Sequence, residues 1–271
     1  MSALVTPGWL EARLDDPSVR ILEASIARET YAAGHIPGAL WIDHFADLLR
    51  NRDESSGLVV TPAQFSALMS RLGVGQETTV VWYGDRHNSY AIRGLWTMDL
   101  YRHPGGCCVL EGGRERWAGE GRALTSEIKP VASTRYPEPR DSSESNRASW
   151  EQVRDAIADP RKVILDVRSE GEYTGQEARA ARGGHIPGAV HVEWTEATAG
   201  ENVLKQPDEL RRMYASLGVT ADKEIIAHCQ LGIRAAHTWF VLKHVLGYPD
   251  VKNYDGSWQE WGNRKDLPVE H

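Results

Sequence analysis

The chain carries the same six-residue string twice, and this duplication constrains its fold more than any other feature. Gly-His-Ile-Pro-Gly-Ala occupies Gly34–Ala39 and recurs at Gly184–Ala189. Self-similarity at a fixed separation is the mark of a repeated structural unit. With 271 residues the chain is long enough for two ordinary domains. We therefore predict two copies of one domain.

The segments around the two strings follow the same order. An apolar strand candidate precedes each string, at Ile21–Glu23 and at Val163–Asp166. Each string is followed by a helical run, a strand, a second helix and a turn before a tryptophan. The matched segments are Leu72–Val74 with Leu217–Val219, Thr79–Tyr83 with Glu224–His228, and Glu111–Trp117 with Asp255–Trp261. Strands that alternate with helices predict an α/β fold in which each domain is a parallel sheet flanked by helices.

Composition and capping patterns place the boundary between the copies near residue 145. Residues 126–148 are rich in Ser, Pro, Glu and Arg with little periodicity, which is typical of a linker. Ser149 and Gln152 then form a capping box, as Thr61 and Gln64 do in the first copy with Pro62 at the first helical position. We predict domains at 1–125 and 149–271, joined by a linker at 126–148.

Charge and cysteine usage exclude several classes of protein. The net charge of −7, without clusters of Lys and Arg, argues against nucleic-acid binding. No apolar stretch is long enough to span a membrane, and the N-terminus lacks the pattern of a signal peptide. Three cysteines and ten histidines show no metal-ligand spacing, so we expect no metal site. A cytoplasmic, reducing location fits these features.

Cys229 lies where a predicted strand gives way to a predicted helix. The β-branched pair Ile225–Ile226 leads to His228-Cys229, and a helical stripe runs from Ala235 to Leu246. Between them lies only a tight loop, whose members after the cysteine are Gln230, Leu231, Gly232, Ile233 and Arg234.

A thiol in such a loop differs from a buried structural one. Loop amides and the positive end of the helix dipole favour thiolate over thiol, and Arg234 adds a permanent cation. Gly232 permits backbone angles that other residues resist. The alternative is that Cys229 is a small buried hydrophobe. We favour a nucleophilic Cys229, because the short loop, the glycine and the arginine occur together.

The other candidate residues read as structural. Cys107-Cys108 precedes a Glu-Gly-Gly turn in an apolar run, so we expect core positions in a strand. His35 and His185 belong to the repeated string in both copies, which favours a turn over catalysis. In the first copy, Cys229 falls opposite Gly84 or Asp85, depending on the alignment. Neither is a thiol, so we predict that the first domain is catalytically silent.

Together these residues resemble the rhodanese family, in particular the tandem-domain bacterial thiosulfate sulfurtransferases. The resemblance covers nearly the whole chain. Its motifs are the doubled Gly-His-Ile-Pro-Gly-Ala, Asp166–Arg168 with Glu172-Tyr173, His228-Cys229 with its loop, and Asn253–Trp258 followed by Glu260–Gly262.

The resemblance implies a mechanism and a set of partners. Cys229 would attack the outer sulfur of a small anionic donor, keep that sulfur as a persulfide cradled by the loop amides, and pass it to a thiol, to cyanide or to a thiol-carrying protein. No cofactor is implied. Arg168, Asp166 and Glu172 are further candidates, since Arg168 could pair with either acid.

The donor and the role stay open at this point. Relatives that use 3-mercaptopyruvate usually carry Gly-Ser-Gly-Val-Thr after the cysteine, whereas this chain carries Gln-Leu-Gly-Ile-Arg, which favours thiosulfate. Mammalian thiosulfate enzymes, however, have Lys and Arg where this chain has Leu231 and Glu172. A persulfide carrier that serves a protein partner is an alternative to an enzyme. A cysteine phosphatase is disfavoured, because its loop places five residues between Cys and Arg and here there are four.

Overall fold

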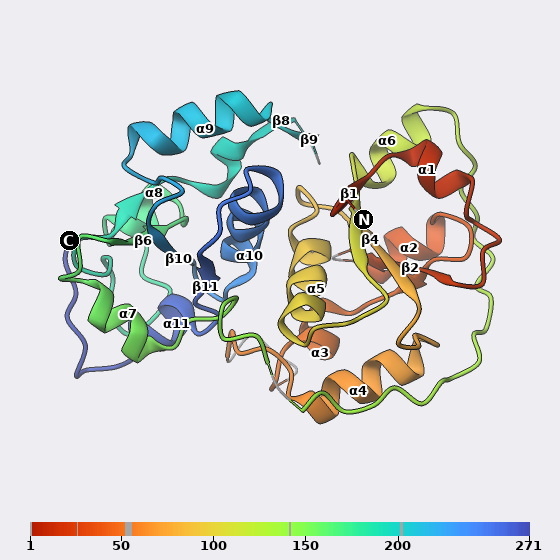
Figure 1. The fold of residues 1–271 in the computed structure, drawn as a ribbon, viewed down its shortest axis with the longest axis horizontal. Coiled ribbons are helices and arrows are strands. Elements are labelled where there is room, and N and C mark those ends of the chain that lie inside the picture. Colours follow the sequence, from red (N-terminus) through yellow and green to blue (C-terminus); the bar gives the residue numbers. More distant parts are fainter. Residues whose placement is uncertain (1, 26, 52–55, 141, 201–202) are drawn as a thin grey trace. The chain divides into compact units, whose positions relative to one another are not determined.

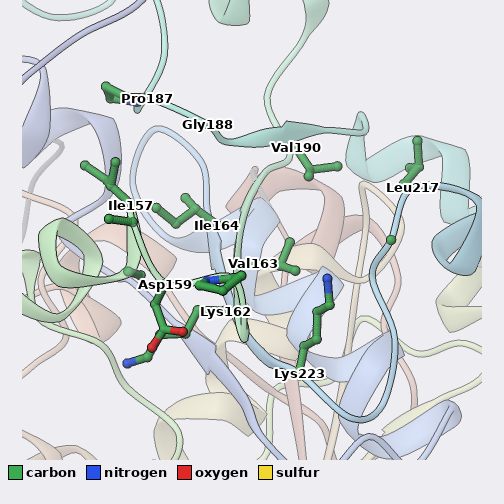
Figure 2. Close-up of a pocket in the computed structure, with 14 residues that line it drawn as sticks. Ile157, Asp159, Lys162, Val163, Ile164, Pro187, Gly188, Val190, Leu217 and Lys223 are labelled. Carbon is green, nitrogen blue, oxygen red and sulfur yellow. The ribbon is translucent and has the colours of Figure 1, made fainter.

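The computed structural model divides the chain into two compact units and describes residues 2–25, 27–51, 56–140, 142–200 and 203–271 (Figure 1). The first unit comprises Met1–Arg52, Val59–Ser143 and Gly200–Val203. The second comprises Asp53–Leu58, Glu144–Ala199 and Leu204–His271. Each contains a parallel sheet with helices around it, so the predicted α/β class is confirmed.

The first unit is built on a sheet of order β1-β5-β4-β2-β3, with every neighbouring pair parallel. Its strands are β1 (Leu4–Val5), β2 (Val19–Ala24), β3 (Leu40–Trp41), β4 (Thr79–Gly84) and β5 (Cys107–Leu110). Its helices are α1 (Pro7–Glu11), α2 (Arg28–Ala33), α3 (His44–Leu48), α4 (Pro62–Arg71), α5 (Ser89–Leu100) and α6 (Gly113–Gly119). Cys108 is fully buried in β5 and Cys107 partly so, as the apolar run predicts.

The second unit repeats this plan with a sheet of order β11-β10-β6-β7, again parallel throughout. Its sheet strands are β6 (Lys162–Asp166), β7 (Val190–His191), β10 (Glu224–His228) and β11 (Val251–Asn253). Its helices are α7 (Trp150–Ala156), α8 (Glu170–Tyr173), α9 (Pro207–Ser216), α10 (Ile233–Phe240) and α11 (Ser257–Trp261), with the short turns η1 (Trp194–Ala197) and η2 (Val241–Val245). Strands β8 (Thr198–Gly200) and β9 (Val203–Leu204) form a separate pair. Within the described ranges, no helix is both long and apolar enough to cross a membrane.

Local sequence signals set several helix ends as predicted. Thr61 and Gln64 form a reciprocal capping box at α4, with Pro62 at its start, and Ser149 and Gln152 do the same at α7. The helix predicted through Leu246 is regular only to Phe240, where the π-helical turn η2 takes over. A π turn inserts an extra residue in the helix, which an apolar stripe does not reveal.

The segment after the first unit's last helix runs back along α4. The Thr134 amide donates to the Ser70 carbonyl at 3.0 Å, and the Ser66 hydroxyl donates to the Tyr136 carbonyl at 2.6 Å. The Tyr136 side chain is buried and packs edge-on against Phe65. This part of the segment is therefore held by ordinary packing in the first unit.

Strand register fixes which residue of the first unit corresponds to Cys229. Glu23 pairs with Trp41 next to one repeated string, just as Asp166 pairs with His191 next to the other. Across the other edge of the same strands, Glu23 pairs with Tyr83 and Asp166 pairs with His228. The residues that follow are Gly84 and Cys229, so the structure selects Gly84, and not Asp85, as the counterpart.

Gly84 has no room for a side chain. A Cβ at this position would overlap the carbonyl oxygen of Ala24 on the neighbouring strand. The first unit therefore lacks a thiol at this place and could not accept one without a shift of its backbone.

Replacing Gly84 by Ala should lower the free energy of unfolding of the first unit by about 1–3 kcal/mol or more, because the added methyl group overlaps rigid backbone. Denaturant titration of the full chain measures this loss. Gly119→Ala is the matched control, since a Cβ there meets nothing within 4 Å and alanine favours the helix. Equal stability of the two variants would contradict the steric argument.

Candidate active site

The second unit gathers its chemically active residues at the carboxyl edge of its sheet. Strand β10 lies between β6 and β11, and His228 at its end is in register with Asp166 at the end of β6. Cys229 follows directly, and Gly232, with a φ of 73°, caps α10. Because parallel strands end at a common edge, the Cys229 loop and the segment after Asp166 lie together.

The loop after Cys229 is bound from outside through its carbonyl groups. The amides of Trp258 and Gln259 in α11 donate to the carbonyls of Cys229 and Gln230 at 2.9 and 3.0 Å. Asn253 Nδ2 donates to the Gly232 carbonyl at 3.0 Å. In a planar trans peptide the next N–H points opposite to the carbonyl. The amides of Gln230, Leu231 and Ile233 therefore face away from these partners.

The N-terminus of α10 adds further backbone donors to this side of the loop. The Ala236 amide is the first to bond back along the helix, to the Gly232 carbonyl at 3.2 Å. The amides of Ile233, Arg234 and Ala235 precede it and have no intrahelical acceptor, as at every helix start. Such a group of amides carries partial positive charge and suits an anion.

Arg234 links the loop to α8. Its guanidinium donates to both carboxylate oxygens of Glu172, at 2.6 and 2.9 Å, and it lies close to Cys229. Burial by itself would lower the pKa of Arg234, but the bonds to Glu172 and the closeness of Cys229 raise it above its ordinary value. The arginine is thus a permanent cation beside the thiol, with a carboxylate partner.

Arg168 pairs with Asp166 and not with Glu172. Its Nη2 lies 2.6 Å from Asp166 Oδ2 and donates to the Gly184 carbonyl at 2.8 Å, and its guanidinium lies over the Trp258 ring at 4.3 Å. Both charged side chains are buried. Burial raises the pKa of Asp166, but His228 and Arg168 more than offset this and keep it below its ordinary value. This buried ion pair lies at the end of β6, beside the strand that leads into the Cys229 loop.

The other members of the predicted loop have mixed surroundings. Gln230 is turned toward Arg179 and Gln259, to which its Nε2 donates at 2.9 and 3.0 Å. Leu231 and Ile233 are partly exposed, while Cys229 is 1% exposed. The two repeated histidines each form an isolated β-bridge, His35 with Thr125 and His185 with Glu270, and the turn follows two residues later. Each ring stacks on a tyrosine, His35 on Tyr31 and His185 on Tyr173.

Ser257 was missed by sequence reasoning, although the sequence carries a sign of its importance. Its hydroxyl accepts the Cys229 amide at 3.1 Å and donates to the Tyr254 carbonyl at 2.7 Å. Ser257 has a φ of 51°, and the matched residue of the first unit, Gly113, has a φ of 56°. Serine thus occupies a left-handed position that the other copy gives to glycine. Serine at this position indicates that the hydrogen bonds of its hydroxyl outweigh the cost of the left-handed backbone angle.

Two variants of Ser257 should separate the hydrogen bond from the strain. Ser257→Ala loses the hydroxyl and keeps the strained angle, so it should lower the free energy of unfolding by about 1–3 kcal/mol. Ser257→Gly loses the same bond but relieves the angle, so it should be about 1 kcal/mol more stable than the alanine variant. Denaturant titration measures both. An alanine variant as stable as the glycine variant would show that the left-handed angle is not strained.

His228 makes stability depend on pH. Burial lowers its pKa to about 4, even though Asp166 Oδ2 lies 3.5 Å away and favours the charged form. In the unfolded chain the imidazole binds a proton near pH 6.5. The folded state stays neutral between these values, so its stability is full above about pH 6.5 and falls as the pH drops toward 4.

Between about pH 4 and 6.5, the free energy of unfolding of the His228→Gln variant should change less with pH than that of the wild type. The difference in slope should be about 1.4 kcal/mol per pH unit, the contribution of one proton. Unfolding free energies of both proteins at pH 4.5, 5.5 and 6.5 provide the measurement. A slope that does not change in the variant would assign the dependence to other groups.

Within the described residues, no cluster of three or more His, Cys, Asp or Glu side chains could hold a metal ion. The residues around Cys229 are instead suited to covalent chemistry on sulfur. They offer a thiol, backbone amides and one arginine.

Comparison with known proteins agrees with this geometry. The model of the family described as "Rhodanese-like domain" matches residues 6–120 and again 149–264. The "Sulfur carrier protein TtuD" of Thermus thermophilus is 40% identical over 98% of this chain and 95% of its own length. The "Thiosulfate sulfurtransferase" of Corynebacterium glutamicum is 36% identical over 98% of this chain and 90% of its own.

A solved structure with the same fold is the anaerobic ergothioneine biosynthesis enzyme from Chlorobium limicola. It superposes with a TM-score of 0.87 at 24% identity, over 99% of this chain and 70% of that one. At this identity the likeness concerns the fold alone.

Proposed function

Because the chain belongs to the rhodanese family, we propose that it is a sulfurtransferase that takes a sulfane sulfur from thiosulfate and carries it as a persulfide on Cys229. One observation carries this proposal: Cys229 begins a loop whose carbonyls are bound by α11 and Asn253, which turns its amides to the opposite side. Fixed amides of this kind can hold a terminal sulfur or a departing oxyanion.

The first half-reaction is a thiol exchange. The Cys229 thiolate attacks the outer sulfur of thiosulfate, a new S–S bond forms, and the old S–S bond breaks as sulfite leaves with its electron pair. The guanidinium of Arg234 lies close to Cys229 and would stabilise the negative charge that moves through the sulfur atoms in this step. The loop amides would stabilise the charge that remains on the persulfide.

The second half-reaction returns the enzyme to its starting state. An acceptor nucleophile, such as cyanide or a cellular thiol, bonds to the terminal sulfur, and the pair of the persulfide S–S bond returns to Cys229. With cyanide the product is thiocyanate. The cycle needs only the thiol, the donor and the acceptor, so we propose that no cofactor takes part. A thiol-carrying protein could occupy the acceptor's place.

The first unit has no part in the chemistry in this proposal. Its counterpart of Cys229 is Gly84, which has no space for a side chain. We assign it a structural role.

Cys229→Ser should abolish sulfur loading and reduce thiocyanate formation to the background rate, because the hydroxyl of serine does not form a persulfide. Mass spectrometry after incubation with thiosulfate, and thiocyanate formation with cyanide, measure the two steps. Cys107→Ser is the matched control: burial raises the pKa of the Cys107 thiol, so loading should be unaffected by its loss. Thiocyanate output that persists in Cys229→Ser would overturn the proposal.

A persulfide carrier is the second candidate, favoured by the name of the Thermus thermophilus relative. A carrier would load Cys229 with one sulfur and then release it slowly to cyanide or small thiols. Single-turnover loading compared with steady-state thiocyanate formation separates the two roles. Rapid turnover with cyanide supports the enzyme, whereas a long-lived persulfide with slow turnover supports the carrier.

A further inference from the structure

Two arginines described at this edge of the sheet, Arg234 and Arg168, already have carboxylate partners. Arg234 holds both oxygens of Glu172, and Arg168 holds Asp166 in a buried pair. A third arginine, Arg179, lies 3.8 Å from Glu172 but is 60% exposed. An exposed cation is screened by solvent and contributes little at the thiol.

Glu172 is fixed in this arrangement by its own helix. It is the third residue of α8, where its carboxylate accepts the backbone amide of Ser169 at 3.3 Å in a capping box. Its side chain is 3% exposed. Tyr173, the next residue, is anchored by its hydroxyl bond to the Ala189 carbonyl at 3.0 Å. These contacts therefore hold the Glu172 carboxylate in position independently of its bonds to Arg234.

Glu172 is ionised at neutral pH. Burial alone would raise its pKa, but the hydrogen bond and charge of Arg234 outweigh this, and the pKa lies below its ordinary value. The Arg234–Glu172 pair then has no net charge. A doubly charged donor that approaches the Cys229 thiolate meets a neutral pair and a like charge on sulfur, where an unpaired arginine would attract it.

We propose that Glu172 is a specificity-determining residue that, by holding Arg234, selects against doubly charged sulfur donors and in favour of singly charged ones. This inference rests on the proposed function. Thiosulfate remains a donor, but Glu172 limits how well the site binds it.

Two donors of nearly equal shape isolate the effect of charge. Thiosulfate carries two negative charges, whereas methanethiosulfonate has a methyl group in place of one oxygen and carries one. Attack of the Cys229 thiolate on the outer sulfur breaks the S–S bond in both, releasing sulfite from the first and methanesulfinate from the second. The persulfide formed on Cys229 is the same.

The experiment compares kcat/KM for the two donors, with cyanide as acceptor, in the wild type and in Glu172→Gln. Glutamine also serves in a capping box, so α8 should keep its start. In Glu172→Gln we expect kcat/KM for thiosulfate, divided by kcat/KM for methanethiosulfonate, to be at least about tenfold higher than in the wild type. The reason is that one unit of negative charge next to the donor is removed. The rise should shrink as salt is added.

Glu170→Gln is the matched control, since Glu170 is exposed on the same helix and its removal changes the net charge equally. Its donor ratio should stay within about twofold of the wild type. A Glu172→Gln variant that slows or speeds both donors equally would overturn the inference and leave Glu172 a structural role. If neither donor loads Cys229 in the wild type, the proposed function itself fails.

A measurement on the wild type tests the same idea without any substitution. Sulfate and methanesulfonate have similar shapes and two charges against one, and both can compete with the donor. We expect methanesulfonate to inhibit at least as well as sulfate. Inhibition by sulfate that is more than about tenfold stronger would show a site with free positive charge and would overturn the inference.

Discussion

The active loop owes its shape to hydrogen bonds that reach its carbonyls from β11 and α11. The carbonyl of Cys229 accepts the amide of Trp258, and the carbonyl of Gln230 accepts the amide of Gln259. The carbonyl of Gly232 accepts the side chain of Asn253. A short loop between a buried strand and a helix would otherwise leave the carbonyls of Cys229 and Gln230 unpaired, at a cost of about 1–3 kcal/mol each. Because peptides are planar, pairing the carbonyls also decides where the amides point. The orientation of the donors around the thiol is thus a consequence of contacts on the far side of the loop.

Each unit contains a buried carboxylate near this loop, and an arginine from a different element neutralises it in each. Each keeps a carboxylate at the end of the strand beside the loop: Glu23 in the first unit and Asp166 in the second. Arg168, two residues along the same strand end, neutralises Asp166, whereas Glu23 is neutralised by Arg114 from α6 and bonded by the Tyr83 hydroxyl. A buried carboxylate without a partner would be costly, so a cation accompanies it in each copy. The first unit therefore keeps a neutralised carboxylate at this place although it lacks the thiol.

The amide next to the strand end is also satisfied differently in the two units. In the second, the Cys229 amide donates to the hydroxyl of Ser257 from α11. In the first, the Gly84 amide donates to the side chain of Asn88, which lies in the loop itself at 2.9 Å. Asn88 in turn donates to the Leu110 carbonyl at 3.1 Å. The loop of the first unit therefore satisfies the amide at the strand end from within itself, whereas the second unit does so from α11.

Sequence alone predicts what depends on near neighbours and misses what depends on folding at long range. The doubled string, the strand that ends at His228 and the capping boxes at Thr61 and Ser149 are local patterns, and the structure contains them. The pairing of Glu172 with Arg234 joins residues 62 positions apart. The sequence offered Arg168 as a partner for Asp166 or Glu172 and gave no sign that Arg234 would pair with Glu172. The folded structure pairs Glu172 with Arg234 and Asp166 with Arg168.

The charges around Cys229 suit a persulfide, which is the intermediate that the proposed reaction forms on this residue. A persulfide on Cys229 carries one negative charge, spread toward its outer sulfur. Oriented amides stabilise such a charge without adding any net charge of their own, and the Arg234–Glu172 pair is neutral overall. An unpaired arginine would bind a dianion and its sulfite product more tightly and would slow the product's release. Because Glu172 cancels that attraction, the site gives up affinity for a doubly charged donor and keeps an environment matched to the singly charged intermediate.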